Sequence, residues 1–187
     1  MPTSDSRVIP AMIQYMRETN ARSILDVGSG CGKWGVLARE YMEVWQGRTY
    51  PDQWIIRIDA VDIWPPYAAY PAYDRHYNHL YITDIVDFVK DMEGYDLIIC
   101  GDVLEHLEKS MAWSVLRQLL KHCRYMVVSI PMGLWPTLNV GDNAHENHIS
   151  TWDDSDIALL PIVKSQFVAS GSGRIFVALL REEIAND

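Results

Sequence analysis

The sequence has few cysteines and no closely spaced cysteine pair. Cys31, Cys100 and Cys123 are its three cysteines, and none of them forms a CxxC motif. An odd number of widely separated thiols argues against a disulfide framework. We therefore expect reduced thiols and a cytoplasmic protein.

Positive charge is also scarce. Lysine and arginine total 16 against 25 aspartates and glutamates, so the net charge is -9 at pH 7. This balance argues against a general nucleic-acid-binding surface and against binding to an anionic membrane. The sequence also lacks an apolar run of membrane-spanning length, an N-terminal signal pattern and internal repeats.

The remaining composition is that of a globular protein. The chain has 187 residues, of which 49% are hydrophobic and 22% are charged. This length suits a single domain, residues 1–187, with a full hydrophobic core.

The stretch SILDVGSGCGKWG, residues 23–35, is typical of a strand, a tight turn and a helix. A short apolar run precedes Gly28, Gly30 and Gly32, and a helical pattern begins at Lys33. Glycine allows positive φ angles and a close approach of a ligand to the backbone, and a helix N-terminus offers free N–H groups. The pattern predicts the first unit of a doubly wound α/β sheet with a cofactor near the turn.

Two cofactors compete at this turn. Gly30, Gly32 and Gly35 fit the GxGxxG fingerprint of dinucleotide binding. Asp26 lies on the strand just before the glycines, where a carboxylate would repel a pyrophosphate and attract a cation. S-adenosylmethionine carries an ammonium and a sulfonium group, so the charge favours it. A glycine turn without a ligand is the remaining alternative.

Strands and helices continue to alternate along the chain. We expect strands at residues 55–63, 79–83, 95–100 and 125–130, and helices at residues 33–44, 85–92, 110–123 and 153–160. Residues 166–170 and 174–181 are expected to pair as a closing hairpin, with its turn at residues 171–173.

Two motifs support a family resemblance. ILDVGSGCG, residues 24–32, resembles motif I of the class I S-adenosylmethionine-dependent methyltransferases. DVLEHL, residues 102–107, follows the fourth expected strand and resembles motif IV of that family. The resemblance implies an α/β fold, a doubly wound, seven-stranded, mostly parallel Rossmann-like sheet with an antiparallel C-terminal strand.

A third pattern is similar to a narrower group. Glu146, His148, Ser150 and Trp152 form an ExHxSxW pattern that resembles small stand-alone bacterial and phage methyltransferases. The second expected strand and its flanks, residues 54–67, are similar to those proteins too. We know of no acceptor common to that group.

The resemblance assigns roles along the cofactor. Asp62, near the end of the second strand, is expected to accept the ribose hydroxyls, with the mid-strand Asp59 as its rival. The family pattern implies that Asp84 bonds the adenine amino group and Ile85 packs on the ring, although Asp84 also suits a helix cap. The expected cofactor-binding set is Asp26, Gly28, Ser29, Gly30, Gly32, Asp62, Ile63, Asp84, Ile85, Cys100, Gly101, Asp102 and Val103.

A long loop, residues 131–152, is expected at the carboxyl edge of the sheet, where crevices of such sheets lie. A hydroxyl acceptor must lose its proton as it attacks, and histidine is suited to remove it near neutral pH. We expect His148 to be this base, with Glu146 orienting it or binding the acceptor. His145 and His106 are the alternative bases, and a purely structural role for His148 is equally open.

The same loop offers metal-ligating residue types without a complete ligand set. Zinc would need a third or fourth ligand beside His145, His148 and Glu146, at defined geometry. Asp142 and Asn143 offer oxygen ligands of the kind that magnesium takes. We expect no metal.

Two further segments have open roles. Residues 64–81 are rich in tyrosine and proline, and the prolines prevent a long helix. This aromatic insertion is expected either to line an acceptor pocket or to pack on itself. The N-terminal helix within residues 1–22, starting near Pro10, is expected either to cover the cofactor or acceptor pocket or to pack against the sheet edge.

The sequence thus favours an S-adenosylmethionine-dependent methyltransferase, a monomer or homodimer, that acts on an oxygen or nitrogen atom of a small molecule or glycan. A nicotinamide-dependent oxidoreductase and a non-catalytic cofactor-binding protein are the alternatives. Modification of nucleic acid is disfavoured by the acidic composition.

Overall fold

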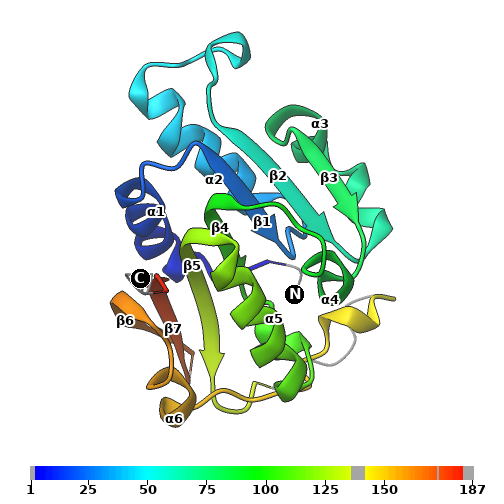
Figure 1. Cartoon of the computed structure of the whole chain (residues 1–187), viewed down its shortest axis with the longest axis vertical. Helices are drawn as coiled ribbons and strands as arrows, with labels where there is room; N and C mark the ends of the chain where they lie inside the picture. The colour runs from blue at the N-terminus through cyan, green and yellow to red at the C-terminus, as the bar shows by residue number, and fades with distance from the viewer. Residues whose placement is uncertain (1–2, 136–141, 172, 183–187) are drawn as a thin grey trace.

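Seven strands form one sheet in the order β3-β2-β1-β4-β5-β7-β6 in the computed structural model, which describes residues 3–135, 142–171 and 173–182 (Figure 1). The strands are β1 (Ser23–Val27), β2 (Arg57–Asp62), β3 (His79–Ile82), β4 (Tyr95–Gly101), β5 (Cys123–Met132), β6 (Ile162–Ser170) and β7 (Gly173–Leu180). Strand β7 runs antiparallel to both of its neighbours, and the other pairs are parallel. The predicted mostly parallel sheet with an antiparallel C-terminal strand is confirmed.

Helices cover both faces of the sheet (Figure 1). The α-helices are α1 (Ile9–Glu18), α2 (Lys33–Met42), α3 (Pro71–His76), α4 (Ile85–Phe88), α5 (Lys109–Lys121) and α6 (Asp154–Ile157). Short 3-10 helices are η1 (Ser6–Val8), η2 (Val44–Gln46), η3 (Pro51–Gln53), η4 (Pro65–Ala69), η5 (Leu104–His106) and η6 (Ala144–Glu146). The doubly wound arrangement follows from this two-sided covering.

Alternate residues of each buried strand serve the two faces, because successive side chains of a strand point in opposite directions. Ile24, Leu97 and Ile99 pack in the cluster that contains α1 and α2. Leu25 and Ile98 pack in the cluster that contains α4, α5 and α6. The central strands β1 and β4 are thus buried on both faces, which explains their nearly continuous apolar sequences.

Some element boundaries differ from the prediction for identifiable reasons. Strand β2 begins at Arg57 and not at residue 55, because the buried Glu43 carboxylate accepts the N–H groups of Ile55 and Ile56 at 2.8 and 2.6 Å. Strand β5 continues through Pro131, which pairs with Ile175 of β7 after the pairing with β4 has ended. Helices α4 and α6 are shorter than expected. Ser172, in the expected hairpin turn, lies outside the described residues.

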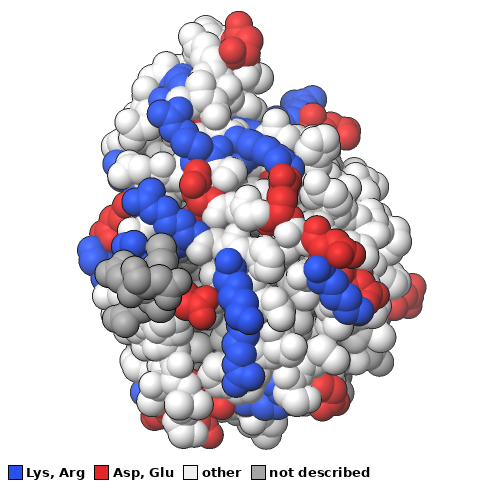
Figure 2. Space-filling model, in the orientation of Figure 1, with Lys and Arg blue, Asp and Glu red and all other residues white. Residues whose placement is uncertain are grey.

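The carboxyl ends of β1, β2, β3 and β4 meet at one edge of the sheet, as parallel pairing requires. The chain leaves these strands at Gly28, Ile63, Thr83 and Asp102, so these turns are neighbours in space. Among the described helices, none combines the length and the apolar character that crossing a membrane requires. Figure 2 shows basic and acidic side chains next to one another on one face of the molecule.

Candidate active site

A cavity of about 730 Å³ opens along the carboxyl edge of the sheet. Its size suits a nucleoside-sized ligand with room for a second small molecule. The cavity is lined by ten of the predicted cofactor-binding residues, namely Gly28, Ser29, Gly30, Asp62, Ile63, Asp84, Ile85, Gly101, Asp102 and Val103. All four predicted catalytic residues, His106, His145, Glu146 and His148, also line it. One cavity therefore joins the two halves of the predicted site.

The glycine turn forms one wall of this cavity. Gly28, Gly30 and Gly32 have φ angles of 64°, 55° and 83°, a region that side chains disfavour. A Cβ atom added to Gly28 would lie 2.6 Å from Cγ2 of Val103, so the turn approaches the end of β4 closely. Conformation favours glycine at all three positions, and space also requires it at Gly28.

The aromatic insertion supports the glycine turn from outside the cavity. The Tyr73 hydroxyl donates to the Gly30 carbonyl at 2.5 Å and lies 2.8 Å from Oγ of Ser29. The Tyr77 hydroxyl accepts the Gly35 N–H at 3.1 Å, and the Tyr73 and Tyr77 rings stack with centroids 5.1 Å apart. Tyr67 of the same segment lines the cavity. The insertion thus packs on itself, braces the turn and contributes one residue to the cavity wall.

Asp26 is placed differently from the prediction. It is fully buried, it is not among the residues that line the cavity, and its Oδ2 accepts the Tyr77 hydroxyl at 2.5 Å. Burial raises the pKa of Asp26 to about 7, against the opposing effect of the Tyr77 hydrogen bond. Because β1 alternates its side chains, Val27 faces the cavity and Asp26 points to the other side. The expected charge match between Asp26 and a bound cation is therefore not supported by this geometry.

Gly32 and Cys100 also lie outside the cavity lining. Gly32 starts α2, and a Cβ atom there would lie 2.5 Å from Cβ of Ala72, so its small size serves packing against α3. Cys100 is buried in the core next to α5, and burial raises the pKa of its thiol. Both residues support the wall without forming it.

Asp62 links the end of β2 to the glycine turn. Its Oδ2 accepts the Gly30 N–H at 2.8 Å and its Oδ1 accepts the Trp64 N–H at 2.9 Å. A carboxylate has about four lone-pair positions, so it can still accept bonds from a diol. The rival Asp59 is bonded to the Tyr95 hydroxyl at 2.8 Å and to Arg57, and does not line the cavity. Of these two acids, Asp62 alone faces the cavity.

Two further turns complete this half of the wall. Asp84 caps α4 by accepting the Val86 N–H at 2.8 Å, and it also lines the cavity. The helix cap is therefore compatible with a position on the cavity wall. Asp102 follows β4 with a φ of 56°, unusual for a residue with a side chain. The Ser129 hydroxyl donates to its carboxylate at 2.8 Å and holds the turn in place.

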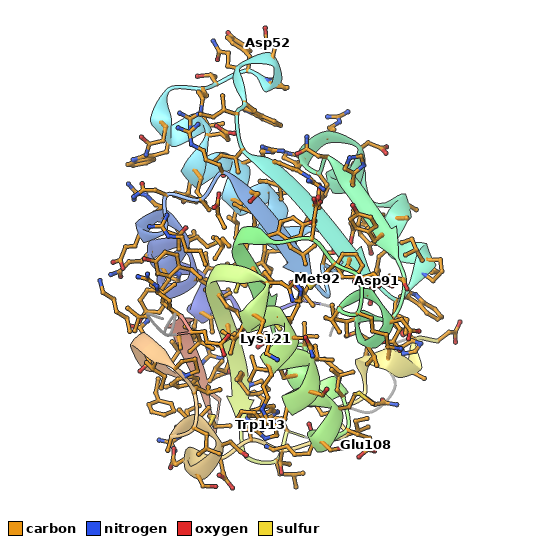
Figure 3. All side chains as sticks on the ribbon, in the orientation of Figure 1. Asp52, Asp91, Met92, Glu108, Trp113 and Lys121 are labelled. Carbon is orange, nitrogen blue, oxygen red and sulfur yellow. The ribbon has the colours of Figure 1, made fainter. Side chains whose placement is uncertain are left out.

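The alternating residues of the ExHxSxW pattern fix the long loop to the site. The Tyr67 hydroxyl donates to Glu146 at 2.6 Å, and the Ser150 hydroxyl donates to the Leu104 carbonyl at 3.3 Å. Trp152 is fully buried, and its ring lies 5.2 Å from that of Trp113, which is labelled on α5 in Figure 3. His148 lies between these anchors and faces the cavity.

His148 meets two residues of the DVLEHL segment. Its ring lies 4.8 Å from that of His106 in a perpendicular arrangement, and its Nε2 is 3.9 Å from Oε1 of Glu105. Burial, followed by the neighbouring His106, lowers the pKa of His148 to about 4, and burial also lowers the pKa of His106. Both imidazoles are therefore neutral near pH 7. Burial raises the pKa of the adjacent Glu105 carboxyl well above its usual value.

Sequence reasoning missed several residues of the cavity wall. Glu105 lies within the DVLEHL motif, but the sequence alone predicts no role for its carboxylate. The described part of the N-terminal segment also contributes, since residues 3–6 line the cavity and Lys33 donates to the Ser4 carbonyl at 2.5 Å. Helix α1 itself packs in the core beside α2. Helix α1 therefore packs against the sheet, and the residues that line the cavity precede it.

Solved structures with the same fold give this cavity a context. No family model and no curated protein sequence matches the chain. TehB from Haemophilus influenzae aligns with 12% identity and a TM-score of 0.67 over 93% of this chain and 62% of its own. The N-methyltransferase NodS from Bradyrhizobium japonicum WM9, in complex with S-adenosylhomocysteine, aligns with 16% identity and a TM-score of 0.64 over 96% of this chain and 89% of its own.

A third structure, magnesium protoporphyrin IX methyltransferase from Synechocystis PCC 6803 with bound S-adenosylmethionine, has 12% identity and a TM-score of 0.62. It covers 94% of this chain and 78% of its own. The chain has the class I methyltransferase fold. In this methyltransferase fold, the cavity at the carboxyl edge lies where open α/β sheets place their ligands.

Proposed function

We propose that the protein is an S-adenosylmethionine-dependent methyltransferase that acts on an oxygen or nitrogen atom of a small-molecule or glycan acceptor. The observation that carries this proposal is that one continuous cavity joins two groups of residues. The glycine turn, Asp62, Asp84 and Val103 line it together with the histidines of the long loop. Two solved structures with the same fold were crystallised with this cofactor or its demethylated product.

The residues of the cavity fit this cofactor part by part. Asp62 retains acceptor capacity for the ribose hydroxyls, and Asp84 and Ile85 lie beyond it for the adenine. The backbone from Gly101 to Val103 offers the methionine end a surface against the glycine turn. When bound, S-adenosylmethionine supplies a methyl group already activated on a sulfonium centre.

The chain therefore has to position an acceptor and remove its proton. Correct orientation alone supplies roughly 7–11 kcal/mol of the barrier in well-aligned systems. We propose that Glu146, whose carboxylate accepts the Tyr67 hydroxyl, orients His148 or binds the acceptor. We propose His148, a neutral imidazole on the cavity wall, as the proton acceptor, with His106 and His145 as the alternatives.

The acidic composition supports a small acceptor. With a net charge of -9, the chain offers little attraction to a phosphate backbone. One similar fold is that of the small RNA methyltransferase HEN1, at 20% identity, so nucleic acid is the acceptor class to test against.

The first test is ligand-dependent thermal stability. S-adenosylhomocysteine at about 100 times its dissociation constant is expected to stabilise the fold by roughly 2.7 kcal/mol, or about 5–10 °C in Tm. NAD⁺ under the same conditions is expected to leave Tm unchanged. Stabilisation by NAD⁺ without stabilisation by S-adenosylhomocysteine would instead establish the dinucleotide alternative.

Asp62→Ala is expected to weaken S-adenosylhomocysteine binding by on the order of 1–3 kcal/mol, because the ribose loses a buried hydrogen-bond partner. Isothermal titration calorimetry measures the change, and the Tm of the unliganded variant reports any loosening of the glycine turn. Asp62→Asn is the matched control, since it keeps the size of the side chain and one acceptor oxygen. Unchanged affinity in Asp62→Ala would show that the ribose is bound elsewhere in the cavity.

A further inference from the structure

Glu105 is an unusual residue for a cavity wall. Its side chain is 1% exposed, yet it lines the cavity. Within the described part of the chain, neither of its carboxylate oxygens has a hydrogen-bond partner. Burying a carboxylate without hydrogen bonds or a cation is costly, so such groups are normally paired or coordinate a metal.

The backbone around Glu105 is held firmly. Glu105 lies in η5, and its carbonyl accepts the N–H groups of Ile149 and Ser150 at 2.9 and 3.0 Å. These two bonds tie the long loop to the turn after β4, although about 40 residues of the chain separate the two segments. His148 is thereby fixed beside Glu105 and His106.

The two histidines present nitrogen atoms to the same point. Nδ1 of His106 lies 3.1 Å from the carbonyl oxygen of Asn147, which makes Nδ1–H the donor and leaves the lone pair on Nε2. A carbonyl that fixes the far nitrogen of a histidine is the usual support for a metal-binding ring. One ligand atom each from Glu105, His106 and His148 lies within 4.8 Å of the other two.

We propose that Glu105, His106 and His148 form a binding site for a divalent first-row transition-metal ion. Atoms bound at about 2.1 Å to one tetrahedral ion lie ~3.4 Å apart, so the widest gap between these ligand atoms has to close by up to roughly 1.4 Å, which side-chain rotation can supply. Two imidazoles and one carboxylate favour ions such as Zn²⁺, Co²⁺ or Mn²⁺ over Ca²⁺ and Mg²⁺. All three residues line the cavity.

This ligand set differs from the one considered from the sequence alone. Glu146 is bonded to Tyr67, and His145 lies against the Trp64 ring with centroids 6.3 Å apart, so neither belongs to the cluster. Two of the three ligands, Glu105 and His106, come from η5, and only His148 comes from the loop. Sequence spacing cannot show this, because the ligands come from two separate segments.

The role of the ion rests on the proposed function. A cation at this point faces the same cavity as the cofactor-binding residues, so it would bind an oxygen atom of the acceptor and lower the pKa of that hydroxyl. His148 would then be a ligand and could not accept the proton. If the ion is bound, a Lewis acid at this point of the cavity takes over the task that was proposed for His148 as a base.

The test is a titration of metal-free protein with Co²⁺. Calorimetry and the visible absorption of the bound ion both measure the binding. We expect one ion per chain, displaced by Zn²⁺ and not by a similar concentration of Mg²⁺. Glu105→Gln, His106→Ala and His148→Ala are each expected to weaken binding at least roughly 100-fold. His145→Ala, on the same cavity but outside the cluster, is the matched control and is expected to bind as the parent does.

Equal affinity in the parent and in the three cluster variants would overturn the site, as would the absence of Co²⁺ binding to the parent. The Tm of each metal-free variant identifies a folding defect, and Glu105→Gln keeps the shape of the side chain if the histidine variants fail to fold. S-adenosylhomocysteine binding is measured separately on metal-free parent protein. Absence of S-adenosylhomocysteine binding, with Co²⁺ still bound, would overturn the methyltransferase proposal. Absence of Co²⁺ binding, with S-adenosylhomocysteine still bound, would overturn the metal site.

Discussion

Gly35→Ala is expected to destabilise the protein by on the order of 3 kcal/mol or more, although alanine is the better helix former by about 1 kcal/mol. Gly35 lies in the first turn of α2, and a Cβ atom there would be 2.2 Å from Cζ of Tyr77 and 2.4 Å from its hydroxyl oxygen. The Tyr77 ring cannot simply move away, because its hydroxyl is bonded to Asp26 and to the Gly35 N–H. Chemical denaturation measures the loss as a lower midpoint.

Gly94→Ala is the matched control for this change. A Cβ atom at Gly94 would have the His122 carbonyl oxygen as its nearest neighbour, at an ordinary 3.7 Å. A double-mutant cycle with Tyr77→Ala identifies the cause, since the cost of Gly35→Ala should largely vanish once the ring is gone. An equal cost in both backgrounds would show that the clash with Tyr77 is not responsible.

The fold could be predicted because its signals are local. The apolar runs of β1, β4 and β5 and the glycines after β1 each specify an element within a few residues. Parallel pairing then brings the strand ends together without further information. For this reason Asp62 and Asp84, more than 20 residues apart, were correctly expected at the edge where the cavity opens.

Contacts between distant segments could not be predicted in this way. The position of Asp26 depends on Tyr77, which is 51 residues away, and the start of β2 depends on the Glu43 carboxylate. A sequence shows that Asp26 precedes a glycine turn but not which side of the strand faces the cavity. The same limit applies to the contact of Glu105 with His148, in which Oε1 and Nε2 lie 3.9 Å apart.

The aromatic insertion shows the difference most clearly. Its tyrosines suggested an acceptor pocket or a self-contained segment. The structure adds a third role, in which Tyr73 and Tyr77 hold Ser29, Gly30 and Gly35 through their hydroxyl groups. The insertion thereby makes the geometry of the glycine turn depend on side chains more than 40 residues away.

His148→Ala is expected to lower turnover by roughly 10²–10⁴-fold, the usual contribution of a positioned acid–base group, while leaving S-adenosylhomocysteine affinity within about twofold. His148 lines the cavity between Glu146, whose carboxylate accepts the Tyr67 hydroxyl, and Ser150, whose hydroxyl donates to the Leu104 carbonyl. Turnover is measured as S-adenosylhomocysteine released with an acceptor that the parent protein methylates. His122→Ala, a histidine bonded to the Gln118 carbonyl outside the cavity, is the control.

The same variant also separates the two chemical roles open to His148. If the ring is the proton acceptor, parent protein stripped of metal keeps its turnover, and added imidazole partly restores that of His148→Ala. If the ring is a metal ligand, stripping the metal alone reproduces the loss of turnover. Glu105→Gln, which removes the proposed carboxylate ligand, then lowers turnover to the same extent. Loss of S-adenosylhomocysteine binding in His148→Ala would contradict both roles, because the residue would then belong to the cofactor pocket or to the fold.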